Sequence, residues 1–67
     1  MDIAKIMLIV ESERLANKVH KTTLCANCDI STTYYNELLK GLKNPSISIV
    51  VALLSQFGIE LIVVKRY

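Results

Sequence analysis

Two cysteines and a histidine are the first residues in this sequence that suggest chemistry. Cys25 and Cys28 form a Cys-x-x-Cys pair, and His20 precedes them. Such a pair can ligate zinc or cycle between thiol and disulfide. A structural zinc site normally takes four ligands, usually from two such pairs, and only one pair is present. A thioredoxin-like site needs a surrounding βαβ pattern, which this sequence lacks. We therefore expect reduced cysteines packed in a core and no metal, with redox sensing and metal binding as the alternatives.

No other constellation in the sequence is typical of an enzyme. We find no pairing of a nucleophile with a base and no glycine-rich loop that could hold a phosphate, and the chain has only two glycines. Its 67 residues are fewer than the roughly 100–200 of a typical domain, so a deep catalytic cleft is excluded. We expect residues 1–67 to form a single domain that is not an enzyme and uses no cofactor.

The composition predicts a folded chain with more apolar surface than its size can hide. Hydrophobic residues make up 52% and charged residues 21%, whereas disordered chains are poor in aliphatic residues. The longest uncharged stretch, 44–59, contains Pro45 and several serines and is shorter than the roughly 20 apolar residues of a membrane span. We expect a cytoplasmic, soluble protein with no membrane contact, whose apolar excess meets a second copy of the chain.

The charge distribution allows nucleic acid as a partner without requiring it. The net charge is +2 and the isoelectric point is near 8.7. Only Asp29 and Glu37 oppose the lysines in the middle of the chain, which are Lys18, Lys21, Lys40 and Lys43.

The pattern of apolar residues, caps and glycines predicts four helices. The first covers 2–17 with Asp2 as its cap, although Ile6–Val10 could instead be a short strand. The second covers 20–27, with Leu24 and Cys25 pointing inward, and a turn follows at 28–30, where Asp29 tolerates a left-handed conformation.

Serines and glycines mark the two helices that follow. Ser31 caps a third helix that runs to about Lys40 and ends at Gly41. Ser46 caps a fourth helix over 47–57, which Gly58 ends. We expect the inward side chains of this fourth helix to be Ile47, Val50, Val51, Leu54 and Phe57.

Residues 19–60 contain four short motifs at a fixed spacing, which are Leu24-Cys25, Ile30-Ser31, Gly41 with Asn44-Pro45-Ser46, and Phe57-Gly58-Ile59. Together they resemble the lambda-repressor-like (XRE/Cro-type) helix-turn-helix family. Leu24-Cys25 stands where the family has Leu-Ala, Ile30-Ser31 matches its turn exit, and Gly41 with Asn44-Pro45-Ser46 matches its Gly-x-x-Asn-Pro-Ser. Phe57-Gly58-Ile59 matches the Leu-Gly-Val after its fourth helix. In this frame Cys25 and Cys28 occupy positions of small or apolar core residues, where reduced cysteine packs well.

The sequence departs from the family at several positions. The family often has Gln at Lys21, Gly at Asp29 and Glu at Leu39. That glutamate commonly braces the fold through an ion pair, and the family's arginine in the first helix is matched only loosely, by Arg14.

The resemblance implies a mainly α domain whose third helix enters the major groove of double-stranded DNA. If Ile30, Tyr35 and Leu38 point inward, a short polar face is left outward. On such a face Thr can contact a thymine methyl, Asn can pair bidentately with adenine, and Glu can accept from cytosine. The base-reading candidates are Thr32, Thr33, Asn36 and Glu37. The phosphate-contacting candidates are Lys21, Ser31, Lys40, Lys43 and Asn44. Tyr34 could also reach a phosphate or be a half-buried surface aromatic.

The last ten residues, 58–67, predict a strand that joins two subunits. β-Branched residues dominate from Ile59 to Val64, with apolar side chains on alternate positions. A lone strand needs a neighbour for its backbone groups, so we expect it to pair with its copy in a homodimer, with an irregular tail as the alternative. The dimerisation candidates are Ile59, Leu61, Ile62, Val63 and Val64.

These observations favour a sequence-specific, homodimeric transcription repressor. The C-terminal segment also resembles the end of HipB-type antitoxins, which bind a toxin and repress their own operon. Such an antitoxin is the first alternative, and a helix-turn-helix module that binds proteins but no longer binds DNA is the second.

Overall fold

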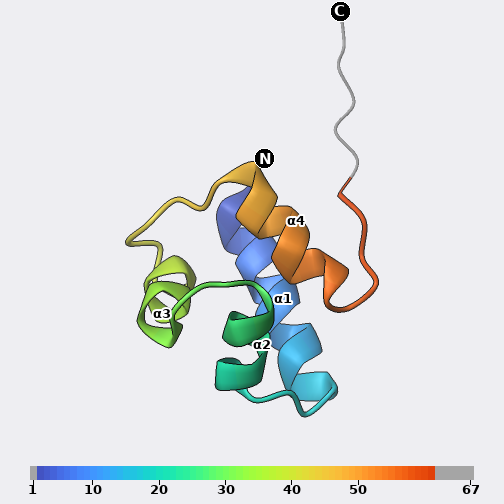
Figure 1. Ribbon diagram of the computed structural model, residues 1–67. Coiled ribbons are helices and arrows are strands. Elements are labelled where there is room, and N and C mark those ends of the chain that lie inside the picture. The colour runs from blue at the N-terminus through green and yellow to red at the C-terminus, as the bar shows by residue number, and fades with distance from the viewer. Residues whose placement is uncertain (1, 62–67) are drawn as a thin grey trace, which may run out of the picture.

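The computed structural model describes residues 2–61, and they form four α-helices around one core (Figure 1). These are α1 (Ile3–Ala16), α2 (Lys21–Asn27), α3 (Thr32–Leu39) and α4 (Ile47–Ser55). The predicted four-helix, mainly α architecture is therefore confirmed, with helix ends within two residues of those expected. Ile6–Val10 is helical, so the alternative of a short strand there is wrong.

Three of the four helices begin at a side-chain cap that the sequence indicated. Asp2 accepts from the backbone N–H of Lys5 at 3.3 Å, and Ser46 accepts from that of Ile49 at 3.3 Å. Ser31 does the same at the start of α3. An N-cap oxygen satisfies one of the backbone donors that a helix start leaves without a partner. His20 precedes α2 without such a bond, so α2 depends more on its packing.

All four helices end in the same type of turn. A residue two or three positions beyond the end of each helix has a positive φ: 56° at Lys18, 57° at Asp29, 76° at Gly41 and 72° at Gly58. At each end the next N–H reaches back to a carbonyl five residues earlier, as in Val19 to Arg14 at 3.0 Å. This is the Schellman motif, which satisfies carbonyls at a helix C-terminus. It ends each helix abruptly and turns the chain back over the core.

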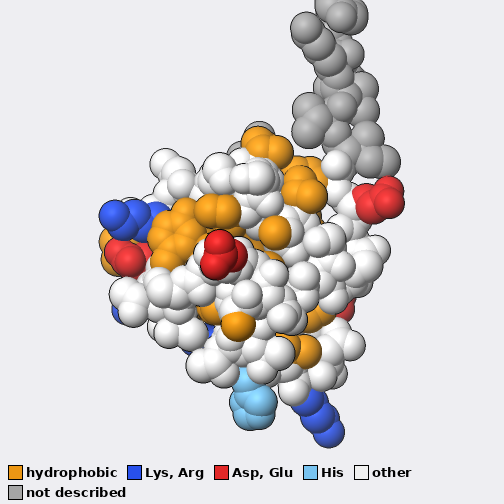
Figure 2. All heavy atoms as spheres, viewed as in Figure 1, with side chains coloured by type: hydrophobic (Ala, Val, Ile, Leu, Met, Phe, Trp, Pro, Cys, Tyr) orange, Lys and Arg blue, Asp and Glu red, His pale blue; other side chains and the backbone are white. Residues whose placement is uncertain are grey.

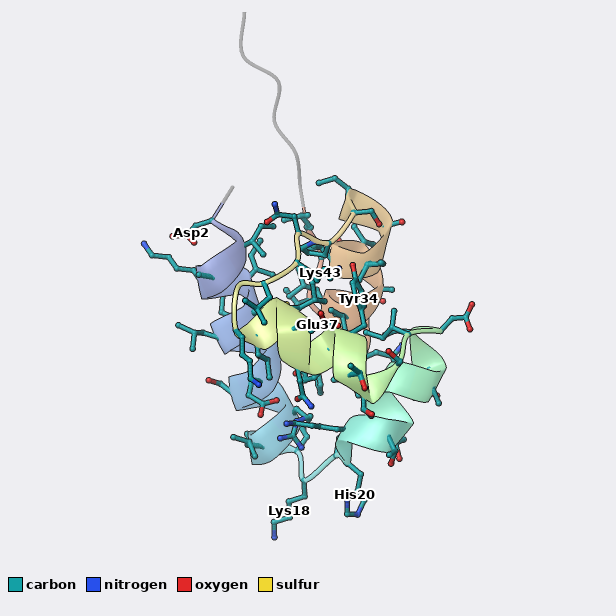
Figure 3. All side chains as sticks on the ribbon, turned by 90° about the vertical axis from the view of Figure 1, so that its left-hand side faces the viewer. Asp2, Lys18, His20, Tyr34, Glu37 and Lys43 are labelled. Atoms are coloured by element: carbon teal, nitrogen blue, oxygen red, sulfur yellow. The ribbon has the colours of Figure 1, made fainter. Side chains whose placement is uncertain are left out.

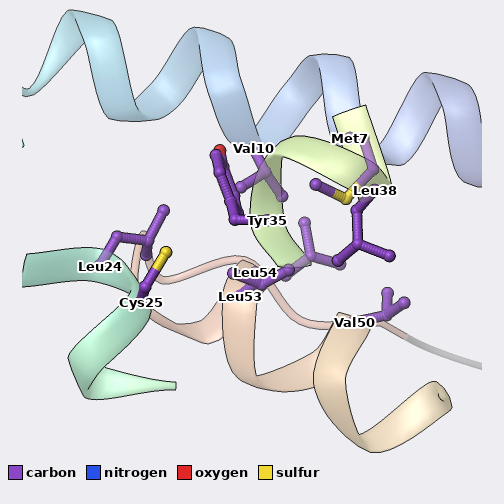
Figure 4. Close-up of a cluster of buried hydrophobic side chains, with 9 residues drawn as sticks. All are labelled: Met7, Val10, Leu24, Cys25, Tyr35, Leu38, Val50, Leu53 and Leu54. Atoms are coloured by element: carbon purple, nitrogen blue, oxygen red, sulfur yellow. The ribbon is translucent and has the colours of Figure 1, made fainter. Parts of the chain in front are cut away.

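One apolar cluster joins the four helices (Figure 4). Leu24 and Cys25 reach it from α2, as predicted. The largest side chain in it is Tyr35 of α3, which is fully buried. Among residues 2–61, the buried side chains of this cluster are Met7, Val10, Leu24, Cys25, Tyr35, Leu38, Val50, Leu53 and Leu54.

The predicted inner face of α4 is partly wrong. Val50 and Leu54 are buried and Phe57 is half-buried, as expected. Ile47 and Val51, however, are 51% and 42% exposed, and Leu53 is fully buried in their place. Because α4 is apolar on nearly every side, its composition does not reveal which residues face the core. The helix is rotated so that the Val50–Leu53–Leu54 side contacts α1.

The predicted strand lies mostly outside the described residues. Its residues 58–61 are described, and they carry no strand; Ile59 and Leu61 pack partly against the core. Residues 62–67, with the dimerisation candidates Ile62, Val63 and Val64, lie beyond the part described. None of the helices within 2–61 has the length and apolar character needed to cross a membrane.

Candidate nucleic-acid interface

A short turn fixes α2 against α3. Cys28 ends α2, Asp29 takes the left-handed conformation, and Ile30 donates its N–H to Cys25 at 3.0 Å. The side-chain oxygen of Ser31 then accepts from the N–H of Tyr34 at 3.0 Å and starts α3. Two short helices joined in this way, both packed on the core, form a helix-turn-helix unit.

The inner and outer faces of α3 are divided as predicted. Tyr35 and Leu38 are buried and Ile30 is half-buried. Among the base-reading candidates Thr33 is exposed, while Thr32, Asn36 and Glu37 are half-buried along the same side of the helix. Figure 3 shows α3 crossing the front of the molecule with nothing drawn over its outer face. A convex polar helix of this kind can enter a major groove.

Tyr34 lies at the edge of this face. Its side chain is half-buried and packs partly against the core, as a surface aromatic does. Its hydroxyl makes no hydrogen bond within residues 2–61, and its contact with a phosphate stays a prediction.

The phosphate-contacting candidates border the outer face of α3 at both ends. Ser31 and the half-buried Lys21 lie at the starts of α3 and α2. Lys40 caps the end of α3, and Lys43 and Asn44 are exposed in the loop that follows. Figure 2 shows basic side chains at the edge of the molecule where α3 and this loop lie. Lysines on both sides of a polar helix are suited to the two phosphate strands that border a groove.

One hydrogen bond joins the two groups of candidates. The ammonium Nζ of Lys21 donates to the amide Oδ1 of Asn36 at 2.9 Å. The first residue of α2 and a polar residue in the middle of α3 therefore form a pair. The sequence predicts a phosphate contact for Lys21 and a base contact for Asn36, and it does not predict this bond between them.

A polar network that was not predicted from the sequence holds α3 against α1. The carboxylate of Glu11 accepts from Arg14 at 2.6 and 2.8 Å, in a bidentate pair. The buried Tyr35 hydroxyl donates to the same carboxylate at 2.9 Å, and Arg14 also donates to the carbonyl of Val19 at 2.8 Å. Two features of the sequence could have indicated this network. Glu11 and Arg14 are three residues apart on one helix, and Leu39 is apolar where the family has an acid. In this chain the acid that pairs with the arginine is Glu11, which lies on α1.

The network changes the acidity of its members. The hydrogen bond from Arg14 holds the pKa of the Glu11 carboxyl below its ordinary value, and Tyr35 adds to that effect. Burial, together with the adjacent Glu11, raises the pKa of the Tyr35 hydroxyl far above its usual range. Both groups therefore keep one protonation state around neutral pH, and the contact between α1 and α3 is constant there.

The cysteines belong to the core side of α2. Cys25 is buried as predicted, whereas Cys28 is only half-buried, and both are free thiols. Burial raises the pKa of each thiol, so both favour the protonated, less reactive form. Within residues 2–61, no three side chains of His, Cys, Asp or Glu are grouped so that they could hold a metal ion.

Comparison with known proteins places this geometry in a family. A family model described as helix-turn-helix matches residues 10–64, most of the chain. The chain therefore belongs to the lambda-repressor-like (XRE) helix-turn-helix family, whose members are DNA-binding domains of transcription regulators. No curated protein and no solved structure matches the chain significantly.

Proposed function

We propose that this chain is a sequence-specific, homodimeric repressor of transcription and that it inserts α3 into the major groove. The observation that carries the proposal is the outer face of α3. It presents Thr32, Thr33, Asn36 and Glu37, which are short polar side chains that can bond to base edges, on a helix fixed from behind by Tyr35 and Leu38.

Phosphate contacts would set the position of α3 in the groove. We assign this role to Lys40, Lys43 and Asn44 at one end of the face and to Ser31 and Lys21 at the other. Such contacts carry little sequence information but supply most of the salt-dependent affinity. A dimer held through residues 59–67 would place two copies of α3 about one helical turn of DNA apart. The protein acts in this account as a binding protein and not as an enzyme.

A salt titration of DNA binding tests this function. DNA duplexes are selected by the protein from a random pool, and affinity is then measured for a selected duplex and a scrambled one across salt concentrations. We expect the selected duplex to bind roughly a thousandfold or more tightly, with affinity falling steeply as salt rises. Weak binding that is equal for both duplexes and nearly independent of salt would overturn the proposal in favour of a protein-binding module.

An antitoxin is the second candidate, because α1 keeps apolar side chains available for a protein partner. Leu8 and Leu15, two turns apart on one side of α1, are 66% and 61% exposed. A toxin could cover that side while α3 binds the operator of the same operon. A toxin gene adjacent to this one, whose product co-purifies with the chain and whose toxicity the chain neutralises, would establish this role. If no neighbouring gene encodes a toxin, the antitoxin role is rejected and the repressor is the function that stands.

A further inference from the structure

The contact between Lys21 and Asn36 determines which groups Asn36 can offer to a base. An ammonium has hydrogen-bond donors only, so the oxygen of the Asn36 amide must be the atom that faces Lys21. The structure shows this arrangement, with 2.9 Å between Nζ and Oδ1. The amide nitrogen Nδ2 and its two hydrogens therefore point away from Lys21, and Nδ2 makes no hydrogen bond within residues 2–61.

An asparagine held in this way is a poor reader of adenine. Bidentate pairing with adenine requires the amide oxygen to accept from the adenine amino group while the amide nitrogen donates to N7. In this chain the oxygen side of Asn36 is covered by a positive charge that itself carries hydrogens. A second donor, such as the adenine amino group, would meet that charge and be repelled.

The pair as a whole offers donors. Asn36 contributes the two hydrogens of Nδ2, and Lys21 contributes the ammonium hydrogens that Asn36 does not use. Guanine presents two acceptors, O6 and N7, side by side in the major groove, whereas cytosine presents an amino donor. The base that best matches a donor pair is therefore guanine.

The surroundings leave the charge of Lys21 available. Glu11 is the nearby acid on α1, but its carboxylate is already bonded to Arg14 and to the hydroxyl of Tyr35. That Glu11–Arg14 pair is the one ion pair within the described part of the chain. Glu37 follows Asn36 on α3 and forms no ion pair with Lys21 in the same region.

We propose that Lys21 and Asn36 act together as a donor unit that selects guanine at one position of each half-site. Lys21 is then a specificity-determining residue that orients Asn36, in addition to any contact with a phosphate. This inference rests on the proposed function, because it requires α3 to lie in a major groove.

The test compares base preferences of the full chain and three variants. Bound duplexes are selected from a random pool with the natural chain and with Lys21→Met, which removes the charge but keeps the length. Affinities are then measured on four synthetic duplexes that differ only at the affected position. We expect guanine in the natural chain and adenine in Lys21→Met, with the guanine-to-adenine affinity ratio changing by roughly tenfold or more.

Two further variants provide the controls. Asn36→Ala should lose the guanine preference at the same position that Lys21→Met changes. Lys40→Met makes the same chemical change at an exposed lysine, and we expect it to keep guanine and to lose affinity equally on all four duplexes. Thermal unfolding of each variant verifies that the domain is folded.

Each outcome separates this inference from the proposed function. If Lys21→Met keeps the natural preference and only weakens binding to every duplex, Lys21 is a phosphate contact and the inference is wrong. Changes at two different positions in Lys21→Met and Asn36→Ala would also overturn it. If the natural chain binds selected and scrambled DNA equally, the proposed function itself fails.

Discussion

At the scale of single residues, the packing of α3 depends on the hydroxyl of Tyr35, a polar group that lies among the apolar side chains of the core. The Tyr35 side chain is fully buried, and its hydroxyl reaches the partly buried Glu11–Arg14 pair at the edge of the core. A buried hydroxyl needs such a partner, because leaving it without a hydrogen bond costs about 1–3 kcal/mol. The same contact orients α3, so a buried residue affects the surface that we propose to bind DNA.

Replacing Tyr35 with Phe tests the value of this contact. Phe keeps the ring in the core but removes the bond to Glu11, and we expect the free energy of unfolding to fall by about 1–2 kcal/mol. Urea denaturation measures the change. Tyr34→Phe is the matched control, because the Tyr34 hydroxyl has no partner within residues 2–61, and it should shift stability by less than about 0.5 kcal/mol. Equal losses in both variants would contradict the account.

The Glu11 carboxyl predicts a specific pH dependence. Its pKa in the folded chain lies below the ordinary value of 4.5, mainly because Arg14 donates to it. The stability that it contributes is therefore complete above that ordinary value and is lost as the pH falls through the lowered pKa. Glu11→Gln should be less stable than the natural chain at pH 7 and approach it in acid, as followed by urea midpoints at several pH values. If the urea midpoints of the two proteins change with pH in parallel, Glu11 is not the group that causes the loss of stability in acid.

At the scale of elements, the sequence predicted the helices well because their ends are marked by local chemistry. Asp2, Ser31 and Ser46 are side-chain caps, and Gly41 and Gly58 supply positive φ values. These signals require only a few neighbouring residues. The end of α1 carries no such marker, because Lys18 occupies the positive-φ position, where glycine is favoured.

Tertiary packing explains what sequence could not predict. The rotation of α4 depends on which of its many apolar residues meet α1, and local pattern does not encode that choice. The Lys21–Asn36 bond joins residues from two helices and becomes visible only when α2 and α3 are placed together. The base-reading and phosphate-contacting residues were located by the family pattern, and their roles stay predictions.

Lys18 offers a direct test of the helix ends. Its φ of 56° lies in the left-handed region, which costs a residue with a Cβ about 1–2 kcal/mol. Glycine removes that cost but loses more entropy on folding, about 0.5–1 kcal/mol. We expect Lys18→Gly to stabilise the chain by about 0.5–1 kcal/mol in urea denaturation, a net gain that follows from these two costs. Lys18→Ala, which removes the same charge and keeps the Cβ, should give no such gain, and an equal gain would assign the effect to charge.

At the scale of the whole molecule, the apolar excess of the composition is visible as exposed side chains. Figure 2 shows apolar side chains at the surface around α4 and toward α3 and the loop before α4. Ile47 and Val51 on that helix and Leu42 in the preceding loop are all more than two-fifths exposed. Four short helices cannot enclose all of these residues, so a second copy of the chain remains the simplest cover for the excess.

Two aspartate substitutions distinguish the possible dimer interfaces. If residues 59–67 join the subunits, Val63→Asp places a charge in that contact and should yield a monomer in sedimentation equilibrium. Val51→Asp, on the exposed side of α4, should leave the dimer intact. The reverse result would place the interface on α4 and contradict the strand pairing. The monomeric variant should also lose affinity for DNA with two half-sites.

We propose that the outer face of α3 reads DNA sequence. Removing the charge of Glu37, which lies on that face, tests this proposal most directly. Base preference is measured for the natural chain, for Glu37→Gln and for Glu60→Gln, which removes the same charge from an exposed residue after α4. Because Glu can accept a hydrogen bond from cytosine, we expect Glu37→Gln to change the preferred base at one position of each half-site, while Glu60→Gln keeps every preference. If the selected sequences are identical for all three proteins, Glu37 reads no base, which contradicts its assignment to the base-reading face of α3.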